Sequence, residues 1–177
     1  MNQIETLEKL CALPGVTGFE QSAARTVAEM LRPLVNKVDI DPFGTVTGIL
    51  VCPRPKAKTV LLDAHLDQIG FIVTEVLEGG FLRFMPVGGV DPRMLLGCEV
   101  TILTPTPLYG IVSCTPPHLM QPGDADKAVP IHEMLIDTGL LDAASRIPVG
   151  TPIVFRQPLL RLGKDAVSSK CLDDRAG

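Results

Sequence analysis

No apolar stretch in the 177-residue sequence approaches the roughly 20 residues that a membrane-spanning helix needs. The N-terminus, Met1–Glu5, also lacks the basic segment and following apolar run of a secretory signal. Membrane-embedded and secreted proteins are therefore not expected classes. We expect a soluble, cytoplasmic protein without a membrane partner.

The sequence also lacks clusters of basic residues. Its 16 Lys and Arg residues are scattered along the chain, and the net charge is −4. Surfaces that bind nucleic acids need clustered Lys and Arg, so we expect no nucleic acid partner. Hydrophobic residues make up 46% of the chain and charged residues 20%, as in soluble globular proteins. A disordered chain is therefore not expected.

The cysteines form no Cys-x-x-Cys pair, and their number is odd. This pattern disfavours both a disulfide framework and a zinc knuckle. Cys171 has no His near it in sequence, so a packing role is favoured over a nucleophilic one. We expect buried free thiols at all five positions, which are Cys11, Cys52, Cys98, Cys114 and Cys171.

The first part of the chain has the periodicity of two helices followed by short strands. Apolar residues recur at helical spacing from Ile4 to Cys11, and a second helix is expected from about Glu20 to Leu31. Shorter runs rich in β-forming residues follow, at Val38–Ile40, Thr45–Cys52 and Thr59–Leu62. Because Thr59–Leu62 is almost entirely apolar, it is expected to be a strand buried on both faces in an α/β sheet.

Between about Gly70 and Pro158 the pattern changes to closely spaced strands with frequent Gly and Pro. Gly79-Gly80 predicts a tight hairpin turn, and a short helix is expected around Leu141–Arg146. This pattern indicates a small barrel or sandwich inserted into an α/β domain that resumes near Leu160. The expected strands of the insert are Phe71–Val76, Phe81–Met85, Glu99–Leu103, Tyr109–Cys114 and Ile153–Phe155.

A first motif, Asp63-Ala-His-Leu-Asp-Gln-Ile-Gly70, directly follows the expected buried strand. Ligand sites of open α/β sheets form at the carboxyl ends of strands, where His65 would lie. Neutral imidazole is a good zinc ligand, and a carboxylate such as Asp67 could accept from its second nitrogen and fix the ring. The alternative is a histidine that is only hydrogen-bonded locally at a strand end.

A second motif, Lys170-Cys-Leu-Asp-Asp-Arg-Ala-Gly177, has adjacent aspartates at the expected opening of a helix. Either Asp173 or Asp174 could be a helix N-cap, accepting from the free N–H groups of the first turn. A carboxylate there could also give one oxygen to each of two cations about 3.5–4 Å apart. From the residues alone, both the helix-capping role and the metal-binding role stay open.

Together these two motifs resemble those of glutamyl aminopeptidase and the tetrahedral aminopeptidases, some of which are also labelled endoglucanase M. Further marks of the resemblance are Lys9–Gly18, Pro116-Pro117-His118 and Ile136–Gly139. The resemblance implies that His65 binds a metal, that Asp67 orients it and that Asp173, rather than Asp174, bridges two metals. It also implies a cis Asp173-Asp174 peptide and two zinc or cobalt ions in the complete enzyme.

The resemblance further implies a fold, an assembly and an activity. We expect a partial zinc-peptidase-like α/β/α catalytic domain over residues 1–69 and 160–177, interrupted by a β-barrel dimerisation domain over 70–159. The family builds hollow homo-oligomeric dodecamers from dimers and removes N-terminal residues from peptides. Its general-base Glu and remaining ligands follow the Asp-Asp motif, so we expect an N-terminal half that is inactive alone.

Two other functions stay open at this point. The chain could be a non-catalytic oligomerisation module, or a glycosidase that uses paired carboxylates without a metal. The glycosidase reading leaves His65 without a task. His118 on a Pro-rich loop and His132 are expected to be structural rather than catalytic. Substrate preference and the identity of the metal are not predicted.

Overall fold

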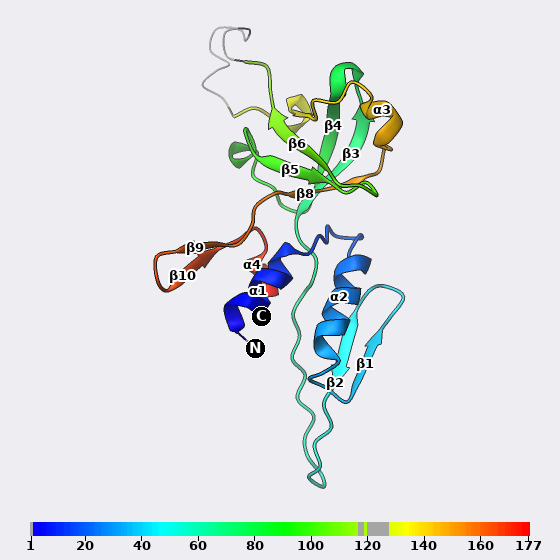
Figure 1. The fold of residues 1–177 in the computed structure, drawn as a ribbon, viewed down its shortest axis with the longest axis vertical. Coiled ribbons are helices and arrows are strands. Elements are labelled where there is room, and N and C mark those ends of the chain that lie inside the picture. Colours follow the sequence, from blue (N-terminus) through cyan, green and yellow to red (C-terminus); the bar gives the residue numbers. More distant parts are fainter. Residues whose placement is uncertain (1, 117–118, 120–127) are drawn as a thin grey trace. The chain divides into compact units, whose positions relative to one another are not determined.

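The computed structural model describes residues 2–116, 119 and 128–177, which form helices, hairpins and a closed barrel (Figure 1). The chain divides into two compact units. The first unit contains residues 1–68 and 158–177, and the second contains residues 69–157. The fold is therefore the mixed α/β class with an inserted barrel that the sequence predicts.

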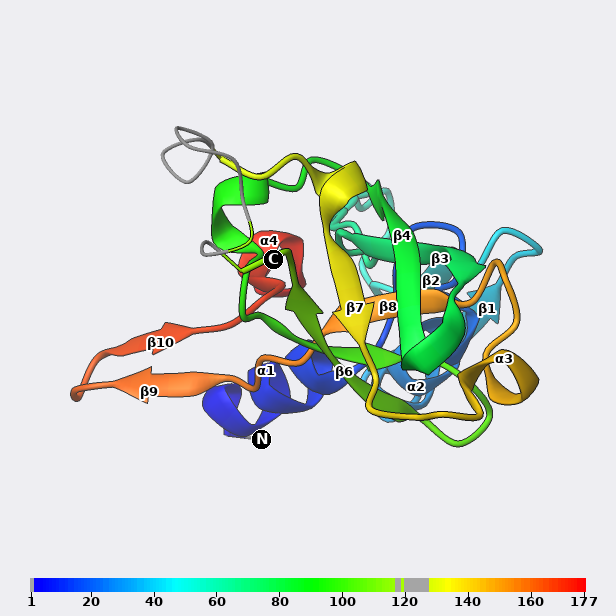
Figure 2. The ribbon, with the colours of Figure 1, turned by 90° about the horizontal axis from the view of Figure 1, so that it is seen from above.

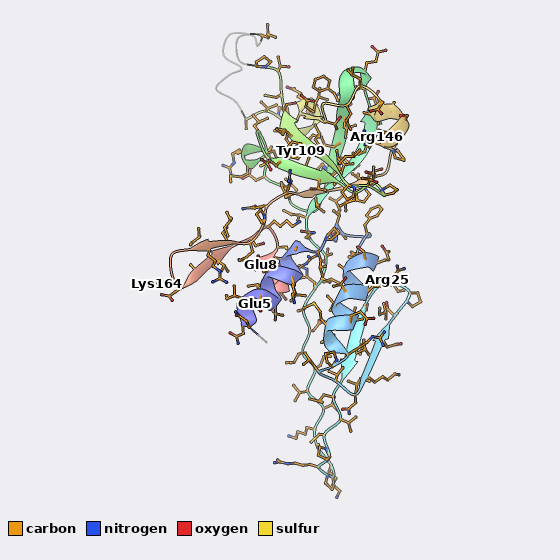
Figure 3. The ribbon with its side chains drawn as sticks, in the orientation of Figure 1. Glu5, Glu8, Arg25, Tyr109, Arg146 and Lys164 are labelled. Carbon is orange, nitrogen blue, oxygen red and sulfur yellow. The ribbon has the colours of Figure 1, made fainter. Side chains whose placement is uncertain are left out.

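The first unit begins with the two predicted helices. Helix α1 spans Gln3–Ala12, and the side chain of Asn2 caps it by accepting from the Ile4 N–H at 3.1 Å. Helix α2 spans Gln21–Leu31 and buries only alanines, at positions 23, 24 and 28. Charged side chains of both helices, such as the labelled Glu5, Glu8 and Arg25, lie on exposed faces (Figure 3).

An antiparallel hairpin follows α2 and packs against it. Strands β1 (Lys37–Ile40) and β2 (Val46–Ile49) pair along their whole length. The turn between them is organised by Asp41, whose Oδ1 accepts from the N–H groups of Phe43 and Thr45, both at 2.9 Å. Strand β2 lies within its predicted range, and β1 begins one residue before the predicted start at Val38.

The predicted buried strand at Thr59–Leu62 is wrong. Residues 50–67, all of which the structure describes, form neither helix nor strand, and Val60, Leu61 and Leu62 are exposed. A strand forms only beside a neighbour that accepts and donates its backbone hydrogen bonds. No strand of the described residues pairs with this run, so it stays extended and open to solvent despite its apolar sequence.

After the barrel, the first unit resumes with a second hairpin and a short helix. Strands β9 (Leu160–Leu162) and β10 (Ala166–Ser168) pair antiparallel, and Lys164 lies in the loop between them (Figure 3). Helix α4 spans Leu172–Arg175 and contacts α1. Neither β9 nor β10 is predicted by the sequence.

The second unit is a closed antiparallel barrel with the strand order β3-β4-β7-β6-β5-β8 (Figures 1 and 2). The five strands predicted for this region are confirmed with small shifts at their ends, and β7 is an additional strand. The bounds are β3 Gly70–Val76, β4 Phe81–Val87, β5 Glu99–Ile102, β6 Leu108–Ser113, β7 Leu135–Asp137 and β8 Pro152–Phe155.

Alternating residues of these strands fill the barrel interior. Phe71 is fully buried and meets both Phe84 and Phe155 edge-on, with ring centroids 5.0 Å apart in each pair. Leu82, Ile102 and other branched residues complete the core. The short helices η1 (Glu78–Gly80), η2 (Pro92–Met94), η4 (Ile131–Glu133) and α3 (Ala143–Arg146) connect the strands.

Two details of the barrel match its predicted character as an insert. The predicted hairpin turn is present, since η1 joins the antiparallel pair β3–β4 and both Gly79 and Gly80 have positive φ. The chain enters through β3 and leaves through β8, which pair with each other at Phe71 and Ile153. The two ends of the barrel therefore lie side by side, as in a segment inserted into a loop.

All five cysteines are free, as predicted, but only Cys11 and Cys171 are buried. Cys98 and Cys114 are partly buried, and Cys52 is exposed in the extended segment after β2. The expectation that all five pack in a core is therefore wrong for three of them. In the part of the chain that the structure describes, no helix combines the length and apolar character needed to cross a membrane.

Candidate metal centre

His65 lies in the extended segment that precedes the barrel, with its side chain 52% exposed. Its Nδ1 lies 3.0 Å from Asp67 Oδ1 and 3.2 Å from the Asp67 carbonyl oxygen. Asp67 therefore holds one edge of the imidazole from two positions along the chain. This contact alone would fit a locally bonded histidine.

The other edge of the imidazole faces the second motif. His65 Nε2 lies 3.1 Å from Asp173 Oδ1, although the two residues are 108 positions apart in sequence. Both belong to the first unit, in which the chain resumes after the barrel. The fold thus brings His65, Asp67 and Asp173 together, while their roles as ligands and orienting group stay predictions.

Neither aspartate of the second motif is a helix N-cap. Cys171 occupies the N-cap position of α4, and Asp173 and Asp174 follow within the helix with non-helical backbone angles. The peptide bond between them is cis, as the resemblance implies. The Asp173 side chain is 98% exposed, so its carboxylate is accessible to a cation from solvent. The capping interpretation of these two residues is therefore wrong.

Thr17 belongs to the same network but was not assigned a role from the sequence. Its Oγ1 donates to Asp67 Oδ2 at 2.5 Å, so the two oxygens of Asp67 bond Thr17 and His65 separately. The backbone supports this contact, because Gln68 N–H donates to the Gly15 carbonyl at 2.8 Å. Thr17 lies within the Lys9–Gly18 run that contributes to the resemblance, but only its three-dimensional contact shows what it does.

The network sets the charges of the two central groups. The hydrogen bond to Asp173, followed by those to Asp67, raises the pKa of His65. The hydrogen bond from Thr17, followed by that from His65, lowers the pKa of Asp67. Asp67 is therefore held as a carboxylate, which is the form that accepts a hydrogen bond from the imidazole.

The distance between His65 Nε2 and Asp173 Oδ1 fits a shared metal ion. Two donors at about 2.0–2.1 Å from a tetrahedral zinc lie roughly 3.3 Å apart, close to the 3.1 Å in this structure. A metal between them would take the place of the proton on Nε2. Within residues 2–116, 119 and 128–177, no three His, Cys, Asp or Glu side chains gather to hold an ion by themselves. The fit is thus that of a partial site.

A cavity of about 800 Å³ in the first unit opens onto these residues. His65, Asp67 and Asp174 form part of its wall, and Glu20 adds another carboxylate. Phe43 and other apolar side chains, including Leu61 and Leu62, line the rest. The cavity therefore combines a group of carboxylates with an apolar wall, as in many small-molecule and peptide sites.

The sequence also drew attention to two further histidines and to Cys171. His132 is in the barrel unit, with its Nε2 3.7 Å from Glu133 Oε1. His118 lies outside the described residues. Cys171 is buried and donates from Sγ to the Cys11 carbonyl oxygen at 3.4 Å, which agrees with its predicted packing role.

Comparisons with known proteins point to one family. The sequence model described as M42 glutamyl aminopeptidase matches residues 46–177. Lysyl aminopeptidase of Pyrococcus furiosus is 31% identical, with 97% of this chain and 51% of that protein aligned. An aminopeptidase from the archaeon Desulfurococcus kamchatkensis has a similar structure, with a TM-score of 0.89, 32% identity and coverage of 99% of this chain and 49% of that chain.

A third relative is known for its assembly. The TET1 peptidase of Pyrococcus horikoshii, described as assembling into a tetrahedron or a large octahedral shell, gives a TM-score of 0.82 at 30% identity. The alignment covers 98% of this chain and 52% of that one. The chain thus spans about half the length of the curated relatives it matches.

Proposed function

Because the chain belongs to the M42 glutamyl aminopeptidase family, we propose that it carries part of the metal centre of a metal-dependent aminopeptidase. Such an enzyme hydrolyses the N-terminal residues of peptides, so peptides with a free amine are the proposed substrates. Two of the curated relatives have specific names, lysyl aminopeptidase and glutamyl aminopeptidase. We infer no side-chain preference from these two different names.

One observation carries the proposal. His65 Nε2 and Asp173 Oδ1 are 3.1 Å apart, while Asp67 occupies the opposite edge of the imidazole at 3.0 Å. A local hydrogen bond would explain only the contact with Asp67. A histidine that binds a metal directs one ring nitrogen towards a neighbouring metal ligand. Its other ring nitrogen donates a hydrogen bond to an acceptor that fixes the ring. His65 meets both requirements.

Each residue has a defined task in this proposal. Asp67 accepts the Nδ1 proton of His65, which fixes the tautomer and leaves the Nε2 lone pair for a metal. His65 and Asp173 would hold a divalent cation, either zinc or cobalt, and the carboxylate of Asp173 would have a second oxygen available for another. When bound, the two cations lower the pKa of a water molecule and polarise the scissile carbonyl.

The remaining ligands and the general base are not assigned to this chain. His65 and Asp173 give two donors, whereas a catalytic zinc usually has three protein ligands and an open position. We therefore propose that the chain is inactive alone and acts with the part of the family's fold that it does not span. By analogy with the TET1 peptidase, which is described as assembling into a tetrahedron or a large octahedral shell, we propose that the chain acts in a homo-oligomer.

The test is metal binding by the full 177-residue chain. Zinc binding is measured by calorimetry. We expect the unmodified chain to bind zinc, and we expect His65→Ala and Asp173→Asn to lose most of their affinity for it. His132→Ala and Asp39→Asn serve as matched controls, because they remove a histidine of the barrel unit and an exposed aspartate of β1. Equal zinc affinity in all five proteins would contradict the proposed site.

A second measurement addresses the activity. Peptides with a free N-terminal amine are incubated with the zinc-loaded chain, and release of the first residue is followed by chromatography. We expect no turnover by the chain alone. Rapid hydrolysis that persists in excess chelator would contradict both the metal dependence and the need for further residues.

A further inference from the structure

Arg175 is a buried cation beside the candidate metal centre. It is the last residue of α4, and only 6% of its surface is exposed. Its guanidinium donates to three backbone carbonyls, from Nε to Leu66 at 3.1 Å, and from Nη1 to Leu10 at 2.7 Å and to Leu13. A buried arginine is uncommon unless its charge and donors are matched.

These carbonyls belong to two segments that are distant from Arg175 in sequence. Leu10 and Leu13 are at the C-terminal end of α1, where helix carbonyls lack intrahelical partners and a cation is favourable. Leu66 is the residue between His65 and Asp67. Figure 1 shows α4 beside α1, and the two helices are in contact. One side chain therefore joins the end of α1, the His65–Asp67 segment and the Asp173–Asp174 turn.

We propose that Arg175 is a positioning residue that fixes the distance between His65 and Asp173. This inference rests on the proposed function of those two residues as metal ligands. Arg175 follows the Asp173–Asp174 turn directly and bonds the carbonyl between His65 and Asp67. It thereby ties the two halves of the site, 108 residues apart, through a single rigid group.

A simple helix-capping role would not need all of these contacts. Capping α1 requires only the bonds to Leu10 and Leu13, which any flexible cation could supply. The Nε bond to Leu66 is additional and uses the fixed fork of the guanidinium, which lysine lacks. Loss of Arg175 would therefore free the His65–Asp67 segment as well as the end of α1.

Gly15 gives an independent way to disturb the same group. A Cβ at Gly15 would lie 2.7 Å from Arg175 Nη2, which is too close without a shift of the guanidinium. Nη2 is buried and has no hydrogen-bond partner among the residues that the structure describes. Gly15→Ala would thus displace Arg175 while leaving its charge and every proposed ligand in place.

The experiment uses cobalt(II) as the probe with the full chain, and visible absorption reports its coordination. We expect Arg175→Gln to weaken cobalt binding about 10- to 100-fold, as for other groups that orient metal ligands. Arg175→Lys should restore part of this loss, and Gly15→Ala should weaken binding in the same direction. All variants are compared at a temperature at which circular dichroism shows them folded.

Two control variants separate positioning from stability. Ala28→Gly destabilises α2 at a buried position without touching the network, and Arg161→Gln removes an exposed cation of the same unit. We expect both to bind cobalt within about twofold of the unmodified chain. If Arg175→Gln and Gly15→Ala are folded and bind cobalt as tightly as these controls, the positioning role is wrong, although the metal site stands.

A metal-free measurement distinguishes failure of the site from failure of the inference. The nitrogen chemical shifts of the neutral His65 imidazole report its tautomer, which Asp67 should hold with the proton on Nδ1. We expect Arg175→Gln and Gly15→Ala to mix the two tautomers. Mixing without any His65-dependent cobalt binding would support positioning and overturn the proposed metal site, whereas an unchanged tautomer would overturn positioning.

Discussion

The two units of the molecule bury their apolar residues in different ways. The barrel unit places large side chains such as Phe71, Leu82 and Ile153 in a fully buried core. Among the described apolar residues of the first unit, only small ones are buried, with Val16 the largest, and Phe43 and Leu62 are about 90% exposed. Both units expose some apolar side chains, such as Leu141 in the barrel, but only the barrel encloses a core of large ones among the described residues.

The difference follows from the pairing of their strands. A closed barrel has no free edge, so six short strands satisfy one another and enclose their own core. The first unit has only two separate two-stranded hairpins, which are marginal without a further layer. A unit that exposes leucines has apolar surface left to bury in a larger fold.

The largest difference between the two units is expected when each is produced separately. We expect residues 69–157 alone to melt cooperatively in circular dichroism, because their termini meet at the β3–β8 pair. We expect residues 1–68 joined directly to 158–177 to show no cooperative transition. A barrel without dispersed amide signals in NMR would show that its core depends on the first unit.

A paired substitution sharpens the comparison at single residues. Leu82→Ala, at a position with no exposed surface, should lower the free energy of unfolding by about 2–5 kcal/mol. Leu62→Ala removes the same atoms from an exposed side chain and should change the free energy of unfolding by less than about 0.5 kcal/mol. Denaturant titrations of the full chain measure both. Similar losses in the two variants would mean that Leu62 is buried in solution.

A smaller effect is expected within the first unit at Thr17. Thr17→Val removes the hydroxyl that donates to Asp67 and should weaken zinc binding about 10-fold, the lower end for groups that orient a ligand. Stability should change little, since Thr17 is exposed. Thr47→Val, on the exposed β2 hairpin, is the matched control and should bind zinc normally. Calorimetry that finds equal affinities would remove Thr17 from the network.

The smallest expected effect is a pH dependence in the barrel unit. Hydrogen bonds from the Arg93 side chain and backbone lower the pKa of Asp91 to about 2. Since the folded pKa lies below the unfolded one, the stabilisation is present above about pH 4 and is lost as the pH falls towards 2.

Asp91→Asn checks this window directly. The difference in unfolding free energy between the unmodified chain and the variant should be constant near neutral pH and vanish between about pH 4 and 2. Arg93→Gln should weaken the same dependence, because it deletes the side-chain hydrogen bonds that lower the pKa of Asp91 and leaves the backbone one in place. A difference that grows as the pH falls would contradict the assignment.

The sequence predicts the barrel better than the first unit for a physical reason. Strands β4, β5 and β6 alternate buried and less buried residues, so their period of two is visible in the sequence. Thr59–Leu62 carries an equally strong apolar signal, but a strand also needs a neighbour. Three-residue strands such as β7 and β9 are too short for periodicity to be visible.

The candidate site shows a similar limit. His65, Asp67 and Asp173 could be selected because their residue types suit a metal and their motifs resemble a known family. Arg175 lies in the second motif and Thr17 in the Lys9–Gly18 run, but their contacts depend on how distant segments of the chain pack together. A carbonyl-bound arginine has no sequence signature, because its partners are backbone atoms.

The unpaired run at Val60–Leu62 has a consequence for the chain inside a cell. Consecutive apolar side chains in an extended, exposed segment are the feature that chaperones hold and that proteases cleave. We expect the chain, when produced alone, to be degraded first between residues 50 and 67. Its lifetime would then be set by how quickly this segment is covered.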